Sequence, residues 1–144
     1  MVLVDTSVWI AFFREKTSTA AQALDTLLEE GEVCICGLIE AELIPGFRQN
    51  DRERVRSLLA GVSRVEIPPD IWPNIIKIQE GALAQGFGPF SIPDLLLASL
   101  AIRNNLPVFS LDRHFINLSR LTGLTLWPER KEKREEECSS GKQE

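Results

Sequence analysis

Short apolar runs alternate along the chain with longer segments in which apolar residues recur every three or four positions. The first run, Val2 to Val4, is β-branched and aliphatic, as is typical of a strand that is buried on both faces. With four similar runs further on, the pattern predicts five strands, at 2–4, 33–36, 64–67, 107–109 and 124–126. Directly after the first run, the polar residues Asp5, Thr6 and Ser7 precede a helical pattern.

The segments between these runs have helical periodicity and helix-terminating signals. Leu24, Leu27 and Leu28 share one helical face, and their pattern stops before Gly31. Asp51 stands in a good capping position for a later helix. The predicted helices cover residues 8–13, 18–30, 38–44, 51–60, 69–86, 91–105 and 113–123, and the helix at 91–105 is the most hydrophobic.

Strands that alternate with helices predict parallel pairing. The predicted fold class is therefore α/β, a three-layer α/β/α sandwich with a central parallel sheet. We expect this domain to cover residues 1–128. The composition then changes to "ERKEKREEECSSGKQE", which has almost no apolar residues, so we expect residues 129–144 to form a disordered or frayed-helical tail.

The composition suits one soluble domain. The chain has 144 residues, of which 44% are hydrophobic and 26% charged. No apolar run approaches the roughly 20 residues that a membrane span needs, and the N-terminus does not resemble a signal peptide. We therefore expect a cytoplasmic protein without membrane contact. Cys34 and Cys36 lie two residues apart on one strand, where they are poorly placed to bond each other, and we expect reduced thiols.

The net charge of −5 argues against a protein that coats nucleic acid, because phosphate contacts need clustered Lys and Arg. It does not exclude a small nuclease, whose acidic metal site would itself contribute negative charge. Basic residues that could line a substrate path are Arg14, Lys16, Arg48, Arg52 and Arg113.

Four carboxylates stand where strands end or helices begin. Asp5 ends the first strand, Asp112 follows the fourth, Asp94 opens the most hydrophobic helix, and Glu42 lies early in the helix after the second strand. Open parallel sheets bind ligands beyond the carboxyl ends of their strands. If the first and fourth strands are neighbours, all four acids face one crevice.

Clustered carboxylates repel each other strongly in a partly buried crevice, and a divalent cation would compensate them. Ligand sets made only of oxygen select Mg²⁺ or Mn²⁺, and the chain has no His or Cys cluster typical of zinc sites. Such an ion can orient a phosphate and activate water. The predicted reaction class is metal-dependent phosphodiester hydrolysis.

Each acid also has a purely structural explanation, because acidic side chains are common near helix starts. Asp5 and Asp112 could cap the helices that follow them. Ser91 and Asp94 have the spacing of a capping box, and Glu42 could lie on a solvated helix face. Each explanation stays open for its residue, whereas the joint placement at strand ends favours a site.

Three segments resemble the PIN-domain ribonucleases, and among these the VapC-type toxins of bacterial and archaeal toxin–antitoxin pairs. They are "LVDTSVWI" at the N-terminus, "EAELIPG" in the helix after the second strand, and "PDLLLASLAIRNNLPVFSLDRHF" near the end. The resemblance covers roughly residues 1–128, and the third segment is its most specific part.

The resemblance implies a Mg²⁺- or Mn²⁺-dependent endoribonuclease that cleaves RNA, commonly as a homodimer, and is held inactive by a cognate antitoxin. The catalytic and metal-binding residues that it implies are Asp5, Glu42, Asp94 and Asp112, with Ser7 and Ser110 in supporting positions. Pro45 disfavours helical geometry at Ile44, so we expect a kink directly after Glu42.

Several further residues are candidates for contact with the substrate. Arg14, Arg113 and His114 are possible substrate contacts, although a metal that activates water makes a histidine base unnecessary. Phe87 and Phe90 could stack on unpaired bases, but loop packing is favoured because no Lys or Arg flanks them.

We expect the antitoxin to wrap the apolar helices near Trp9 and the region 38–48. It would insert an Arg or Lys towards Asp5 and Asp94.

Two alternative functions remain open at this stage. One is a non-catalytic binding domain with a PIN-like fold. The other is a different metal-dependent phosphohydrolase on a similar sheet. A haloacid-dehalogenase-like enzyme would have a second aspartate at position 7, where Ser7 stands, and a receiver domain would have a lysine after the last core strand, which "FSLD" lacks.

Overall fold

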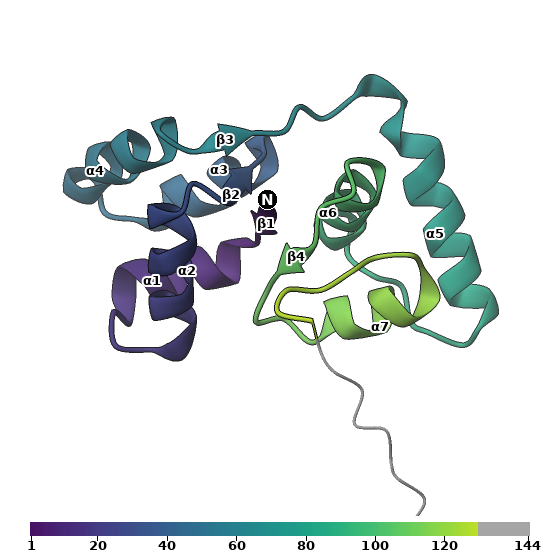
Figure 1. Ribbon diagram of the computed structural model, residues 1–144. Coiled ribbons are helices and arrows are strands. Elements are labelled where there is room, and N and C mark those ends of the chain that lie inside the picture. The colour runs from purple at the N-terminus through teal and green to yellow at the C-terminus, as the bar shows by residue number, and fades with distance from the viewer. Residues whose placement is uncertain (130–144) are drawn as a thin grey trace, which may run out of the picture.

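The computed structural model describes residues 1–129, and these form a parallel sheet between two groups of helices (Figure 1). The strands are β1 (Val2–Val4), β2 (Val33–Ile35), β3 (Ser63–Arg64) and β4 (Val108–Phe109). The helices are α1 (Thr6–Arg14), α2 (Thr19–Glu29), α3 (Gly37–Leu43), α4 (Gln49–Ala60), α5 (Trp72–Ala84), α6 (Ile92–Arg103) and α7 (His114–Leu121), with 3₁₀ turns at Ile44–Gly46 and Pro69–Ile71.

The strand order β3-β2-β1-β4 explains how the helices are divided between the two faces. From β1 to β3 the chain steps in one direction, so right-handed crossovers place α1 to α4 on one face. Between β3 and β4 the chain crosses back over the sheet, which places α5 and α6 on the other face, where α7 joins them. This arrangement confirms the predicted α/β/α class.

The central strand is β1, and it is bonded on both sides. Leu3 is paired with Cys34 of β2 and with Val108 of β4, and Val4 is paired with Phe109. The condition on which the predicted crevice depends, that the first and fourth strands are neighbours, is therefore met.

Two predicted strands differ in the structure. The third lies at 63–64 rather than 64–67, because the chain leaves the sheet towards Pro68 and Pro69, which have no N–H to donate. The fifth, at 124–126, is wrong as a strand and is reduced to one parallel bridge between Val108 and Leu126. Pro128 cannot extend that ladder.

Two helix ends also differ from the sequence prediction. Asp51 does not cap α4, because the helix already begins at Gln49 and Arg48 is the N-cap residue. Ile44 keeps helical dihedrals, φ −63° and ψ −48°, although it precedes Pro45, so the expected departure from helical geometry there is wrong. The chain instead tightens from α3 into the 3₁₀ turn at Ile44–Gly46.

The core lies on both sides of β1. Helix α6 buries every residue from Leu95 to Ala101, as expected for the most hydrophobic helix. Trp9 is 0% exposed, because α1 turns this ring into the core. Cys34 and Cys36 are buried and free of a disulfide, as predicted.

Most of the predicted tail, residues 130–144 with Cys138, lies outside the described residues. Across residues 1–129, each helix is too short or too polar to cross a membrane.

Candidate active site

The four predicted acids come from four elements that meet at the carboxyl end of the sheet. Asp5 directly follows β1, and Asp112 lies in the loop between β4 and α7. Asp94 is in the first turn of α6, and Glu42 is in the last turn of α3. Because β1 and β4 are adjacent, the loops after these two strands lie side by side.

Asp5 is held by two serine hydroxyls rather than used as a helix cap. Ser7 Oγ donates to Asp5 Oδ2 at 2.8 Å, and Ser110 Oγ donates to the same oxygen at 2.7 Å. The carboxylate makes no capping bond to α1. The structural explanation for Asp5 therefore fails, and both serines contact this carboxylate directly.

The same serines join the loops after β1 and β4. Leu111 N donates to Ser7 Oγ and Asp112 N donates to Ser110 Oγ, each at 3.0 Å. Each hydroxyl thus accepts from the backbone on one side and donates to Asp5 on the other. The orientation of Asp5 therefore depends on the nearby Ser7 and on Ser110, which is 105 positions away in sequence.

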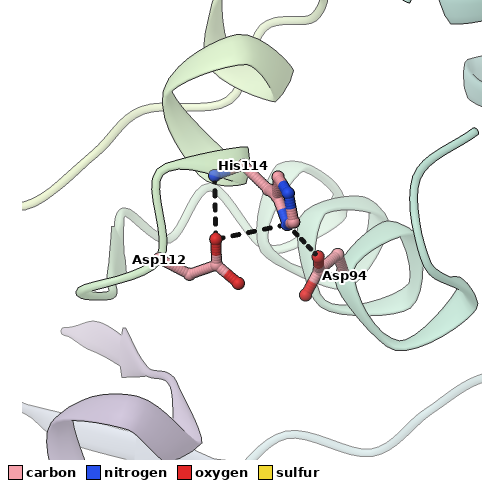
Figure 2. A group of neighbouring side chains, drawn as sticks. All are labelled: Asp94, Asp112 and His114. Atoms are coloured by element: carbon pink, nitrogen blue, oxygen red, sulfur yellow. Dashed lines mark hydrogen bonds and ion pairs between the residues drawn. The ribbon is translucent and has the colours of Figure 1, made fainter. Parts of the chain in front are cut away.

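Asp94 and Asp112 approach each other through His114. His114 Nδ1 lies 3.4 Å from Asp94 Oδ2 and 3.2 Å from Asp112 Oδ1, so the imidazole bridges the two carboxylates (Figure 2). Asp112 Oδ1 also accepts the His114 backbone N–H at 2.9 Å, so the capping explanation for Asp112 holds in part. Within residues 1–129, these three side chains form the group whose possible ligand atoms all lie within 4.8 Å of one another.

From the sequence, His114 is predicted only as a possible substrate contact. The one sequence signal for a role of His114 in the site is its position two residues after Asp112. No neighbouring residue indicates that α6 brings Asp94 to the Nδ1 atom of His114.

The pKa values of Asp94 and Glu42 are raised by burial and by the neighbouring carboxylates. Burial raises the pKa of Asp94, and the charges of Asp112 and Asp5 raise it further, against the opposing effects of the Ser91 hydroxyl and His114. The Asp94 side chain is 16% exposed. Burial also raises the pKa of Glu42, and Asp5 and Asp94 add to this rise. The charges of the four carboxylates therefore act on one another at the carboxyl end of the sheet, and we call this group the carboxylate cleft.

Glu42, rather than its neighbour Glu40, is the glutamate of this cleft. Glu40 forms an ion pair with Arg64 of β3, which directs its charge away from the other acids. Thr6 Oγ1 is buried and has no hydrogen-bond partner in the described part of the chain that satisfies normal geometry. It still lies near enough to the Glu42 carboxylate to lower the pKa of Glu42.

Arg14 and Arg113, the two arginines predicted as substrate contacts, have different surroundings. Arg14 Nη2 donates to Gly46 O at 3.2 Å, and its guanidinium lies 5.6 Å from the centre of the Phe47 ring. It therefore ties the end of α1 to the 3₁₀ turn after α3. Arg113 is exposed and stands between Asp112 and His114 as the N-cap residue of α7.

The donor set fits a hard divalent cation. It consists of carboxylate oxygens with one imidazole nitrogen, and the raised pKa values of Glu42 and Asp94 indicate negative charge that a cation would relieve. The unpartnered Thr6 hydroxyl beside Glu42 adds one more oxygen with spare hydrogen-bonding capacity. Asp94 and Asp112 are the pair best placed to hold the ion, with Asp5 and Glu42 in the same cleft.

The family model and the similar proteins of known function agree on one family. The PIN domain model matches residues 2–121. A VapC ribonuclease of Mycobacterium bovis is 30% identical over 128 residues, which span 86% of this chain and 96% of that protein. Ribonuclease VapC21 of Mycobacterium tuberculosis is 28% identical over 117 residues, 78% of this chain and 83% of that protein.

Solved structures agree on the fold. VapBC2 from Rickettsia felis, bound to a DNA fragment from its promoter, matches with a TM-score of 0.71 and 16% identity over 88% of this chain and 97% of that one. A toxin–antitoxin complex from Klebsiella pneumoniae matches with a TM-score of 0.63 and 20% identity over 78% and 87%. VapC20 of M. tuberculosis, described as a sarcin-ricin loop cleaving toxin, has a TM-score of 0.54 and 15% identity over 81% and 94%.

Proposed function

The chain belongs to the PIN domain family, and from this premise we propose that it is a Mg²⁺- or Mn²⁺-dependent endoribonuclease, the toxin of a toxin–antitoxin pair. The observation that carries the proposal is that Asp94 and Asp112 meet at His114, with Asp5 and Glu42 near enough for their charges and that of Asp94 to act on one another. The relatives named as VapC ribonucleases support RNA as the substrate. The same proposal places the protein in the cytoplasm, where RNA and an antitoxin are available.

In this proposal Asp94 and Asp112 hold the ion, and Asp5 and Glu42 complete its surroundings. The bound ion would supply the positive charge that orients the scissile phosphate and stabilises the leaving oxygen. Ser7 and Ser110 fix Asp5 by donating two hydrogen bonds to one of its oxygens, which leaves the other oxygen available to the cleft. His114 lies between Asp94 and Asp112 and orients both.

The direct test is cleavage of RNA by the purified chain. We expect cleavage with Mg²⁺ or Mn²⁺ and none after EDTA, with activity restored when the ion is added back in excess. Sequencing the RNA ends identifies the cut site. Hydrolysis of p-nitrophenyl phosphate without RNA cleavage would favour a different phosphohydrolase, and tight metal binding without either activity would favour a non-catalytic PIN-like domain.

We propose that the antitoxin binds a groove between α1, α2 and α4, next to the helix face that carries the buried Trp9. The groove encloses about 450 Å³ and is lined by the apolar side chains of Phe12, Phe13 and Leu58. Charged residues surround it, namely Lys16, Asp25 and Arg54. An apolar segment with charged flanks matches this lining, and toxin–antitoxin complexes among the solved neighbours support such a partner.

We further propose a homodimer through the exposed side of α5. Trp72, Ile76 and Leu83 recur at helical spacing, and each is at least half exposed. Lys77 and Glu80 stand beside this apolar stripe. Across a two-fold axis, antiparallel packing of two α5 helices would place the lysine of one copy opposite the glutamate of the other.

We expect Ile76→Lys to convert a dimer into a monomer, because it places two ammonium groups in an apolar contact. Sedimentation velocity over a range of protein concentrations measures this. Ile10→Lys, at an exposed apolar position on α1, is the matched control and should leave the mass unchanged. A parent protein that is monomeric at high concentration, or an Ile76→Lys variant that stays dimeric, would contradict this interface.

A further inference from the structure

An aromatic row borders the carboxylate cleft. The Phe87 and Phe90 rings are nearly parallel, with centres 6.2 Å apart and planes at 25°. The Phe90 and His114 rings are nearly perpendicular, with centres 6.3 Å apart and planes at 82°. His114 is the same imidazole that bridges Asp94 and Asp112 (Figure 2).

The middle of this row is fixed and its two ends reach solvent. Phe90 is 8% exposed and belongs to the core, as the packing interpretation expects. Phe87 is only half-buried, and the His114 side chain is 63% exposed. Packing therefore accounts for Phe90 but leaves part of Phe87 and most of His114 open to solvent, and His114 lies directly beside Asp94 and Asp112.

The Gln79 side chain holds the backbone of the central residue, Phe90. Gln79 of α5 donates from Nε2 to Phe90 O at 2.8 Å, and Phe90 N donates to Gln79 Oε1 at 3.0 Å. The next residue, Ser91, caps α6 by accepting from Asp94 N at 3.3 Å. The loop that presents the aromatic row is thus preorganised, and it sets the start of the helix that carries Asp94.

The electrostatics of the cleft call for a binding contribution that does not depend on charge. Four carboxylates repel the phosphates of RNA, and the chain as a whole carries a net charge of −5. Stacking of a base on an aromatic ring is insensitive to that repulsion and contributes substantially for each base. A base within a duplex already has both faces covered, so only an unpaired base can use such a surface.

We propose that the row Phe87–Phe90–His114 is a stacking platform that receives an unpaired base of the substrate next to the scissile phosphate, and thereby selects single-stranded RNA. This rests on the proposed ribonuclease function and adds a substrate-binding surface to it. Phe87 and His114 contact the base, Phe90 supports them, and Gln79 positions Phe90.

The kinetic test compares Phe87→Ala with the parent on a short single-stranded RNA in Mg²⁺. We expect the KM to rise by about ten- to a hundredfold while kcat changes little, because stacking contributes equally to the bound and transition states. Phe87→Tyr should restore the KM. Leu28→Ala, at a half-buried apolar position near the end of α2 and outside the α1–α2–α4 groove, is the control and should behave as the parent does.

A binding test separates the platform from catalysis. In Phe87→Trp, we expect the added indole fluorescence to be quenched by single-stranded RNA in Ca²⁺ buffer. A duplex of the same sequence, or a strand with abasic positions, should not quench it. The parent protein, which has Trp9, Trp72 and Trp127, supplies the background signal.

The outcomes are distinguishable. Equal quenching by abasic RNA, or an unchanged KM in Phe87→Ala while the parent cleaves RNA, overturns the platform and leaves the ribonuclease function standing. Quenching only by unpaired bases in a protein that cleaves no RNA supports the platform and overturns the ribonuclease function. Melting curves of each variant, compared with the parent, show whether the loop has unfolded instead.

Discussion

We expect Asp5→Asn and Asp94→Asn each to reduce kcat/KM for RNA cleavage by a factor on the order of a thousand in Mg²⁺, while the far-UV circular dichroism stays that of the parent. Each change removes one negative charge from the cleft and keeps the shape of the side chain. At position 5 the amide would still meet Ser7 and Ser110, but without the charge that draws a cation into the cleft. The measurement is initial rate against RNA concentration, with Mg²⁺ binding followed by calorimetry.

Asp51→Asn is the matched control, because Asp51 is an exposed acid in the first turn of α4, outside the cleft. We expect it to cleave RNA as the parent does. If Asp5→Asn and Asp94→Asn retain the parent rate while the parent itself is inhibited by EDTA, these carboxylates do not hold the ion.

The same substitution at Asp94 has a consequence for stability without metal. Burial and the charges of Asp112 and Asp5 raise the pKa of Asp94 in the folded state. The folded protein therefore binds this proton more readily than the unfolded chain, and stability falls as the pH rises through the raised pKa. At pH 7 in EDTA we expect Asp94→Asn to melt a few degrees higher than the parent. This difference should shrink as the pH falls towards the ordinary range of a carboxyl group, and a parent that melts at the higher temperature would contradict the repulsion.

We expect coexpression with the small open reading frame beside the gene to relieve the toxicity of the chain, and we expect the two proteins to copurify. The groove between α1, α2 and α4 offers apolar surface for most of the affinity, and the acidic cleft offers a socket for an inserted Arg or Lys from the partner. A guanidinium placed there would compete with the metal and pair with Asp5 and Asp94. Growth after induction and the composition of the purified complex are the two readouts.

Variants on α4 locate the contact. Leu58→Asp places a charge in the groove, and we expect it to lose the antitoxin while it still cleaves RNA. Arg54→Glu, which also lines the groove, should weaken the complex, whereas Arg56→Glu on the same helix should not. If the neighbouring product neither copurifies nor restores growth, the toxin assignment fails and the ribonuclease assignment remains.

Much of the architecture follows from local pattern. The apolar run at residues 2–4, the leucines at helical spacing and the stop at Gly31 are read from adjacent residues, and these decide the alternation of strands and helices. Alternation in turn favours parallel strands with their carboxyl ends at one edge. The sequence therefore located Asp5 and Asp112 at that edge.

Tertiary structure decided which side chains meet and which are free to bind. Ser110 reaches Asp5 across 105 positions, and His114 meets Asp94 only because α6 and α7 pack on the same face of the sheet. Such contacts depend on strand order and helix packing, which periodicity does not specify. For the same reason the complete burial of Trp9 could not be predicted from the sequence. Periodicity shows that Trp9 lies on an apolar helix face but does not show what covers that face.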